Sequence, residues 1–246
     1  YGTAGVTAWV NEVGAVPTRN FQTSYFEPYK QINGERLRAE IHVTDKGCMG
    51  CPIPCGKYSL ARVPMGEAYV EGPEYETIAM IGGDCCLDDI REIAYANYIC
   101  DELGLDTISA GNVVAFALEC YERGVLTRED IGREVAFGDL DSVVYLLKLI
   151  AAREGIGDLL AEGVKVASER LGKGSDRYAI HVKGLEPAEQ EVRGLKAWGL
   201  GWATSSRGAD HLRAYPVAET TWTPEQAKAL FGTDKVVDRF AYEGKP

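Results

Sequence analysis

The stretch that most constrains this chain is residues 47–57, GCMGCPIPCGK. It brings Cys48, Cys51 and Cys55 close together in sequence, and its glycines and prolines keep the segment out of a regular helix. Three thiols at such short spacing indicate a shared partner. The fold is therefore expected to present this loop to a metal centre.

The spacing Cys-x2-Cys-x3-Cys leaves two kinds of centre open. Iron–sulfur clusters are held by thiolates, commonly three that are close in sequence and one that is distant. A structural zinc site needs four ligands, and the sequence has no second Cys-x-x-Cys, although His42 could supply one ligand. The spacing favours a cluster over zinc, but it does not identify a fourth ligand.

The remaining cysteines do not form a disulfide pattern. The chain has seven cysteines, an odd number, and Cys85 and Cys86 are adjacent and could not easily pair with each other. Cys100 and Cys120 lie in helical patterns, where cysteine is usually a small buried apolar residue. This usage favours a reducing, cytoplasmic setting.

Charge and composition exclude several classes of function. The net charge is −11, and Lys and Arg are scattered, which argues against a nucleic-acid partner. No apolar run is long enough to cross a membrane, so no membrane partner is expected. With 46% apolar residues, the chain can bury a sizeable core. It begins without Met and ends without a clear terminating signal, so we expect a piece of a longer polypeptide.

Apolar periodicity predicts an all-α, multihelical fold. Helices are expected over 3–13, 88–103, 109–123, 141–153, 157–171 and 224–231. Residues 14–47 read as mixed and loop-like, 58–70 as a short apolar–polar segment, 178–184 as a strand-like run, and 193–211 as a Gly- and Trp-rich loop. The change in composition near 178 predicts two helical domains, 1–178 and 179–246, of which the second is incomplete.

Three further motifs contain candidate functional residues. EGPEYET (71–77) places Glu74 and Glu76 after Pro73, where acids favour the helix dipole or supply an acid/base group. CDELGLD (100–106) reads as an ordinary glycine C-cap, or as carboxylates that receive N–H donors from a heterocycle. SSRGADH (205–211) combines Arg207, which could bind an anion, with His211, which could move a proton.

Taken together, the motifs resemble the tungsten-dependent aldehyde ferredoxin oxidoreductase family. The resemblance is carried, in this order, by YGTA (1–4), NFQT (20–23), CMGCPIPCG (48–56), EGPEYET (71–77), CDELGLDTISAG (100–111) and SSRGADHL (205–212). It implies an enzyme with an N-terminal β-rich domain and two helical domains. It also implies a tungsten (or molybdenum) bis-pyranopterin beside a [4Fe–4S] cluster, aldehyde oxidation to carboxylic acids, and electron transfer to ferredoxin.

The resemblance also implies roles for individual residues. Cys48, Cys51 and Cys55 match the three clustered cluster ligands. Glu76 matches a glutamate near the metal, and His211 matches a histidine near the substrate. The residues expected to face the pterin or its phosphates are Asp101, Leu105, Asp106, Arg207 and Arg213.

The chain departs from the family pattern at both ends. The N-terminal pterin-binding domain is absent, and so is the second Asp-x-x-Gly-Leu-Cys motif, whose cysteine is the family's fourth cluster ligand. The chain alone is therefore expected to be inactive, with the three thiols free or oxidised more often than metal-bound. The intact protein could form a homo-oligomer.

Three alternatives remain open at this point. The chain could be part of the catalytic subunit of an aromatic acyl-thioester (acyl-CoA) reductase of the same family. It could be a zinc-stabilised helical interaction module. A one-cluster electron carrier is disfavoured by the large helical body.

Overall fold

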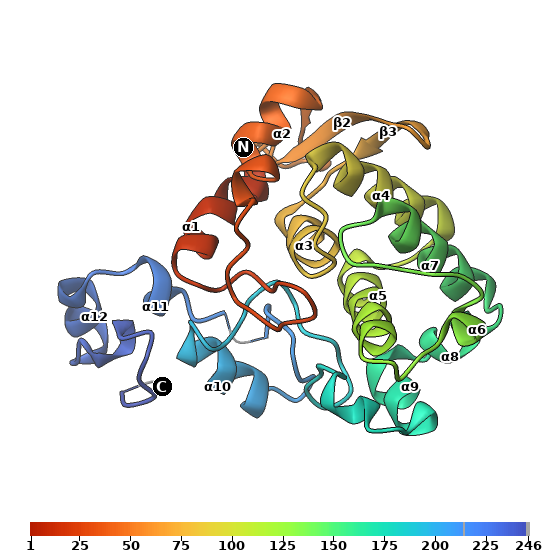
Figure 1. Cartoon of the computed structure of the whole chain (residues 1–246). Coiled ribbons are helices and arrows are strands. Elements are labelled where there is room, and N and C mark those ends of the chain that lie inside the picture. Colours follow the sequence, from red (N-terminus) through yellow and green to blue (C-terminus); the bar gives the residue numbers. More distant parts are fainter. Residues whose placement is uncertain (214, 245–246) are drawn as a thin grey trace.

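The computed structural model describes residues 1–213 and 215–244, apart from the side chain of Val217. Helices dominate it, which confirms the multihelical prediction, and one small antiparallel sheet is added (Figure 1). The α-helices are α1 (Thr7–Glu12), α2 (Gly34–Glu40), α3 (Tyr75–Thr77), α4 (Ile90–Leu103), α5 (Thr107–Glu122), α6 (Arg128–Ile131), α7 (Leu140–Ala152), α8 (Ile156–Leu160), α9 (Gly163–Leu171), α10 (Lys196–Thr204), α11 (Val217–Thr221) and α12 (Pro224–Phe231).

The core lies around the long helices α4, α5 and α7. Their inward faces are fully buried and include Ile93, Phe116 and Leu146. Helix α5 also packs closely on the π-helix Ile78–Gly83, which continues α3. A Cβ at Gly111 of α5 would lie 2.8 Å from Met80, so only glycine allows this approach without a shift. This contact holds the motif around residue 76 against the centre of the molecule.

A tight corner joins α4 to α5. Gly104 ends α4 in the left-handed conformation (φ 68°), which confirms the predicted glycine C-cap. Two residues later Asp106 begins α5, and its carboxylate accepts from the backbone N–H of Ser109 at 2.8 Å. The axes of the two helices differ by 110°. The corner exposes Asp101 and Asp106 on one surface.

Local capping signals mark other helix starts as expected. Thr127 forms a capping box with Asp130 at the start of α6, and Thr223 forms one with Gln226 at the start of α12, with Pro224 directly after it. The predicted helix over 157–171 is instead two helices, α8 and α9.

The structure differs from the sequence interpretation in four regions. The segment 58–70 belongs to a hairpin of β2 (Gly56–Val63) and β3 (Gly66–Glu71), which pairs through β2 with β1 (His42–Lys46) in the sheet order β1-β2-β3. The region 14–47 therefore includes a strand as well as α2. The 178–184 run forms only an isolated bridge between Val182 and Leu185, and the 193–211 region contains helix α10.

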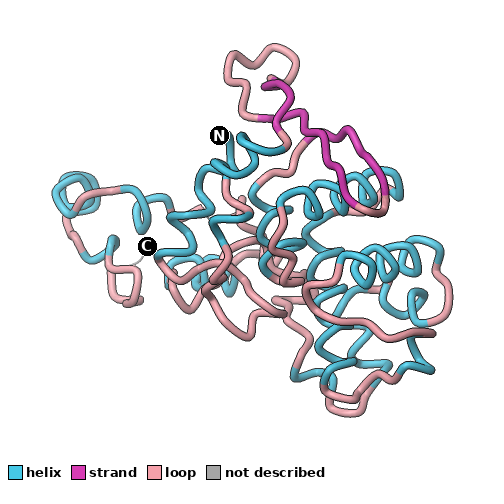
Figure 2. Tube along the Cα trace, turned by 45° about the horizontal axis from the view of Figure 1, so that its top comes forward, coloured by secondary structure: helices cyan, strands magenta, loops and turns pink. Residues whose placement is uncertain are grey.

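The sheet holds the cysteine segment away from the helices. The loop 47–55 connects β1 to β2 and projects beyond the ends of these strands (Figure 2, top). The division into domains 1–178 and 179–246 stays a prediction. Among the described residues, no single helix has the length and apolarity to cross a bilayer, although α4 and α5 together, as a bent pair, meet the criterion by length and composition.

Candidate active site

The cysteine loop presents its three thiols to solvent. Cys48, Cys51 and Cys55 are all exposed and free. The chain turns between Cys48 and Cys51. Gly50 has φ 75°, and the backbone N–H of Cys51 donates to the carbonyl of Cys48 at 3.0 Å. Such a set of accessible thiols fits three of the four ligands of a [4Fe–4S] cluster.

The other cysteines do not offer a fourth ligand. Cys85, Cys100 and Cys120 are buried in the hydrophobic core, and Cys86 is half-buried against it. The prediction that Cys100 and Cys120 are buried apolar residues is confirmed. Burial also raises the pKa of both thiols to about 12, which keeps them protonated and unsuited to metal binding.

A buried lysine holds the end of the cysteine loop. The side chain of Lys57 is 5% exposed, and its Nζ donates to the carbonyls of Pro54, Cys55 and Gly56 at 2.9–3.1 Å. Asp45, on β1, lies 3.3 Å from the same ammonium group. These contacts satisfy a charge that would otherwise be costly to bury.

The first residues of the chain link the cysteine loop to the glutamate motif. A Cβ on Gly2 would lie 2.2 Å from the Cys55 carbonyl oxygen, so glycine is required for this packing. The hydroxyl of Thr3 accepts from the backbone N–H of Tyr75 at 2.9 Å and donates to the carboxylate of Glu74. The YGTA and EGPEYET motifs, far apart in sequence, therefore form one structural unit.

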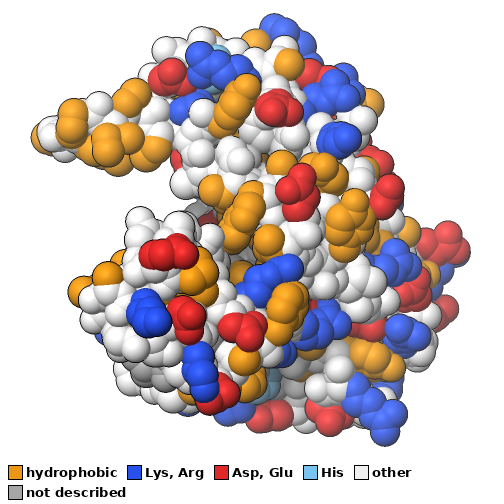
Figure 3. Space-filling model, turned by 90° about the vertical axis from the view of Figure 1, so that its left-hand side faces the viewer, with side chains coloured by type: hydrophobic (Ala, Val, Ile, Leu, Met, Phe, Trp, Pro, Cys, Tyr) orange, Lys and Arg blue, Asp and Glu red, His pale blue; other side chains and the backbone are white. Residues whose placement is uncertain are grey.

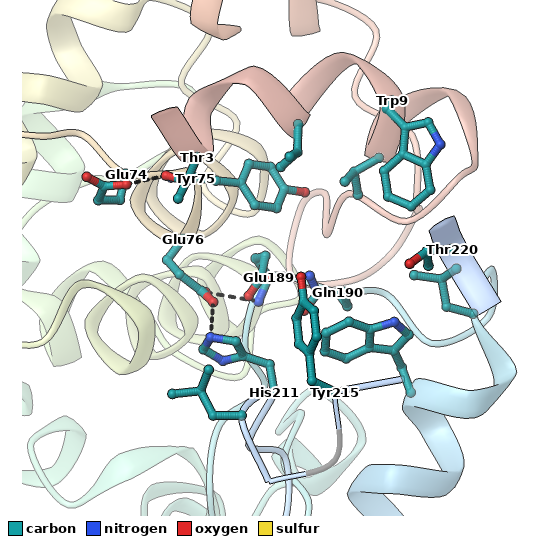
Figure 4. Close-up of a pocket in the computed structure, with 15 residues that line it drawn as sticks. Thr3, Trp9, Glu74, Tyr75, Glu76, Glu189, Gln190, His211, Tyr215 and Thr220 are labelled. Atoms are coloured by element: carbon teal, nitrogen blue, oxygen red, sulfur yellow. Dashed lines mark hydrogen bonds and ion pairs between the residues drawn. The ribbon is translucent and has the colours of Figure 1, made fainter. Parts of the chain in front are cut away.

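At the centre of the site, Glu76, Glu189 and His211 converge (Figure 4). Nε2 of His211 lies 3.2 Å from Oε1 of Glu76. The backbone N–H of Glu189 donates to Oε2 of Glu76 at 3.1 Å. One side-chain ligand atom from each of the three residues lies within 4.8 Å of the others. Two predicted catalytic residues from opposite halves of the sequence are thus in contact.

The pair of carboxyl groups changes the protonation of Glu76. Burial, followed by the hydrogen bond and charge of Glu189, raises the pKa of Glu76 from 4.5 to about 11. The raised pKa favours the protonated form of Glu76, which can donate a hydrogen bond. This coupling of two carboxyl groups in one site is typical of acid/base centres.

A largely apolar cavity of about 460 Å³ opens beside this cluster. It lies between the N-terminal helices and the segment from α10 to α11, on the side of the molecule that Figure 3 shows as hollowed. Its lining residues are Thr3, Val6, Trp9, Val10, Glu74, Tyr75, Glu76, Glu189, Gln190, Leu195, Trp198, His211, Leu212, Tyr215 and Thr220. The size and lining suit a small organic molecule whose reacting atom would lie at Glu76 and His211.

A second, more open and more polar cavity lies on the other side of Glu76. It brings together the predicted pterin residues Asp101, Leu105 and Asp106, with Glu76 shared between the two cavities. Asp101 accepts from Asn97 at 3.0 Å, and Asp106 caps α5. The carboxylate acceptors of this surface fit the N–H groups of a pterin ring, so the residues present are compatible with that cofactor.

Arg207 and Arg213 are placed differently. Both side chains are largely exposed and point to Asp210, with Arg207 Nη1 at 2.9 Å and Arg213 Nε at 3.5 Å from its Oδ2. Neither residue is among those that line the two cavities. Their contact with a pterin or its phosphates stays a prediction.

The sequence reasoning missed several residues of the cavity. Glu189 and Gln190 lie in EPAEQE (186–191), and this acid-rich segment is almost wholly buried rather than solvated. Tyr75 precedes Glu76, and Trp198 lies on α10. One feature of the sequence could have indicated these residues. It is the high density of acids in 186–191, next to the Gly- and Trp-rich stretch 193–211.

The chain is similar to known proteins. The family model described as "Aldehyde ferredoxin oxidoreductase, domains 2 & 3" matches residues 1–246. The tungsten-containing aldehyde ferredoxin oxidoreductase of Pyrococcus abyssi is 40% identical over 222 residues, covering 89% of this chain and 36% of the relative. An aliphatic sulfonate oxidoreductase subunit (WOR-like) of Pyrococcus furiosus is 36% identical over 225 residues, covering 87% and 36%.

A solved structure is also similar. The active-site complex BamBC of benzoyl coenzyme A reductase, with 1,5-dienoyl-CoA, matches with a TM-score of 0.60 and 26% identity. The match covers 70% of this chain and 26% of that one. The chain therefore spans only about a third of the length of the relatives it matches.

Proposed function

The chain belongs to the aldehyde ferredoxin oxidoreductase family, and from this premise we propose that it forms the helical part of an enzyme that oxidises aldehydes to carboxylic acids. The overall reaction is R–CHO + H₂O → R–COOH + 2 e⁻ + 2 H⁺, with ferredoxin as the electron acceptor. The proposal includes a cytoplasmic setting. The observation that carries it is the contact of Glu76 with His211 at the end of an apolar cavity.

The cofactors would be bound at the two surfaces that flank Glu76. Cys48, Cys51 and Cys55 would hold a [4Fe–4S] cluster, and Asp101 and Asp106 would face a pterin. When bound, the tungsten (or molybdenum) centre would supply Lewis acidity and accept the two electrons. The remaining cage, including the fourth cluster ligand, would come from parts of the enzyme outside this chain.

The residues of this chain would bind the aldehyde and transfer protons. The apolar walls would exclude bulk water from the aldehyde carbon. Glu76, neutral because its pKa is raised, would donate a hydrogen bond from Oε1 or Oε2 to the aldehyde oxygen. Nε2 of His211 would accept the proton that the attacking water loses.

The test is made on the anaerobically purified intact enzyme. We expect tungsten or molybdenum, iron and sulfide, and aldehyde-dependent reduction of ferredoxin. Zinc without iron would support a zinc-stabilised interaction module instead. A fully loaded protein that oxidises no aldehyde would contradict the proposed activity.

A second candidate follows from the structural match. The similarity to the benzoyl coenzyme A reductase complex favours acyl-thioester reduction as the alternative reaction. The same enzyme preparation would then reduce an aromatic acyl-CoA with a low-potential donor. Activity with the thioester and none with aldehydes would favour this candidate.

A further inference from the structure

Three buried polar groups in the apolar cavity have no hydrogen-bond partner among the described residues. They are the hydroxyl of Tyr75, the indole N–H of Trp198 and the amide oxygen of Gln190. The three residues are only 3%, 3% and 6% exposed. Leaving a buried donor or acceptor unpaired is destabilising, so such groups call for a partner.

These groups lie away from the reacting end of the cavity. In Figure 4 the hydroxyl end of Tyr75 extends toward the side of Gln190 and Tyr215, whereas Glu76, Glu189 and His211 gather on the other side. The ring of Trp198 packs edge-on against Tyr215, with centroids 4.9 Å apart. Burial raises the pKa of Tyr75 well above its ordinary value, so its O–H remains a donor.

Much of the cavity lining is apolar or aromatic. It includes Val6, Trp9, Val10, Leu195 and Leu212. These side chains offer a broad apolar surface for a ring or a short hydrocarbon body.

Acidic side chains predominate among the charged residues of the cavity lining. Among the described residues that line it are Glu74, Glu76 and Glu189, together with His211, and no Lys or Arg. A substrate with a carboxylate or phosphate at its distal end would enter an acidic, poorly solvated site without a cation to pair with. The lining therefore selects against anions.

On the basis of the proposed function, we propose that this cavity selects neutral aldehydes with an aromatic or similarly bulky apolar body and a distal hydroxyl group. The aldehyde carbon would lie at Glu76 and His211. The distal hydroxyl would accept from Tyr75 and donate to the amide oxygen of Gln190. One hydroxyl thus satisfies a donor and an acceptor together, which an alkyl group or a carboxylate cannot do.

The experiment uses the intact, cofactor-loaded enzyme and three para-substituted benzaldehydes. 4-(Hydroxymethyl)benzaldehyde is compared with 4-ethylbenzaldehyde, which has a similar shape but no hydroxyl, and with 4-carboxybenzaldehyde. We expect kcat/KM for the hydroxymethyl compound to exceed that for the ethyl compound about tenfold or more. The carboxylate should be the poorest of the three.

Tyr75→Phe provides the decisive variant. Because its hydroxyl has no protein partner, the substitution should leave thermal stability unchanged while reducing the preference for the hydroxymethyl compound several-fold, mainly through KM. Gln190→Met should reduce the preference in the same way, because it removes the acceptor, and it keeps the test valid if Tyr75→Phe folds poorly. Tyr69→Phe, at an exposed position on β3, is the matched control and should change nothing.

The outcomes separate the two proposals. If the loaded enzyme oxidises none of the three aldehydes, the proposed function fails. If it oxidises the hydroxymethyl and ethyl compounds equally, or if Tyr75→Phe keeps the full preference, the substrate inference fails while the proposed function stands.

Discussion

The backbone N–H of Glu189 donates to the carboxyl group of Glu76 at 3.1 Å, and so joins the segment after residue 178 to the helix that follows β3. The side chain of Glu189 lies beside the same carboxyl group, with its Oε2 buried and unpaired. Two acids in one buried site cannot both ionise cheaply, so one proton is retained. The geometry thus places a carboxyl group with a raised pKa at the apolar cavity.

Replacing Glu76 by Gln in the intact enzyme should remove this proton donor. We expect kcat to fall about 10²-fold or more, since positioned acid/base groups contribute roughly 10²–10⁴-fold. Tungsten and iron content should not change. Glu12→Gln, at an exposed position on α1, is the control, and unchanged turnover of Glu76→Gln would contradict the proposed role.

His211→Gln should lower kcat to a similar extent, because it removes the group that receives the proton. The double variant with Glu76→Gln should lose little more than either single variant, since the two side chains act as one unit across 3.2 Å. Steady-state kinetics of all three proteins tests this. Fully additive losses would show that the two residues act separately.

Asp84 should make stability depend on pH. Its side chain is 0% exposed, and burial raises its pKa well above 3.8, although Phe21 N–H donates to it at 2.8 Å. The folded state then binds a proton that the unfolded state has released. The free energy of unfolding should therefore fall as the pH rises above about 4, by up to about 1.4 kcal/mol per pH unit for this group.

Asp84→Asn isolates this contribution. The amide oxygen can still accept from the backbone N–H of Phe21, and the amide side chain at position 84 does not titrate. In denaturant unfolding, the free energy of unfolding of the variant should therefore exceed that of the parent by an amount that grows with pH. Asp88→Asn, at an exposed neighbouring position, is the control. The difference in its free energy of unfolding from the parent should not change with pH. A constant difference between Asp84→Asn and the parent would show that Asp84 is already ionised in the fold.

Lys57 should be needed for the cysteine loop. Lys57→Met leaves three carbonyl groups without their shared donor, and hydrogen bonds to charged groups contribute about 1.5–3 kcal/mol. We expect lower stability and reduced iron content in the intact enzyme. Lys46→Met, at a more exposed lysine of the same sheet, is the control. It should lower the free energy of unfolding by only about 0–1 kcal/mol, and this variant should keep its iron.

The proposed cluster has its own test. Cys51→Ser in the intact enzyme should lower iron and sulfide and abolish the visible band of the cluster. Cys120→Ala, at a buried cysteine, should destabilise the core modestly and leave iron bound. Equal iron content in Cys51→Ser and the parent would exclude this loop as the binding site.

Local sequence signals predicted much of this protein. Gly104, Thr127 and Thr223 mark the ends or starts of helices where expected, because capping depends on side chains within a few residues of the cap. The grouping of Cys48, Cys51 and Cys55 on one exposed loop also follows from spacing alone. The apolar–polar segment 58–70 was not assigned to strands; it forms a hairpin of two short strands, and their pairing depends on each other rather than on helical periodicity.

By itself, the sequence determined the helical class, the cap positions and the identity of the reactive side chains, all of which depend on near neighbours. Only the tertiary structure decided that Glu76 contacts His211, that the backbone N–H of Glu189 donates to Glu76, and that Tyr75 and Trp198 line one cavity. These relationships join residues that are far apart along the chain. They arise because the packing of α5 and of the segment after residue 178 buries acids and aromatic side chains together, and no local pattern encodes that proximity.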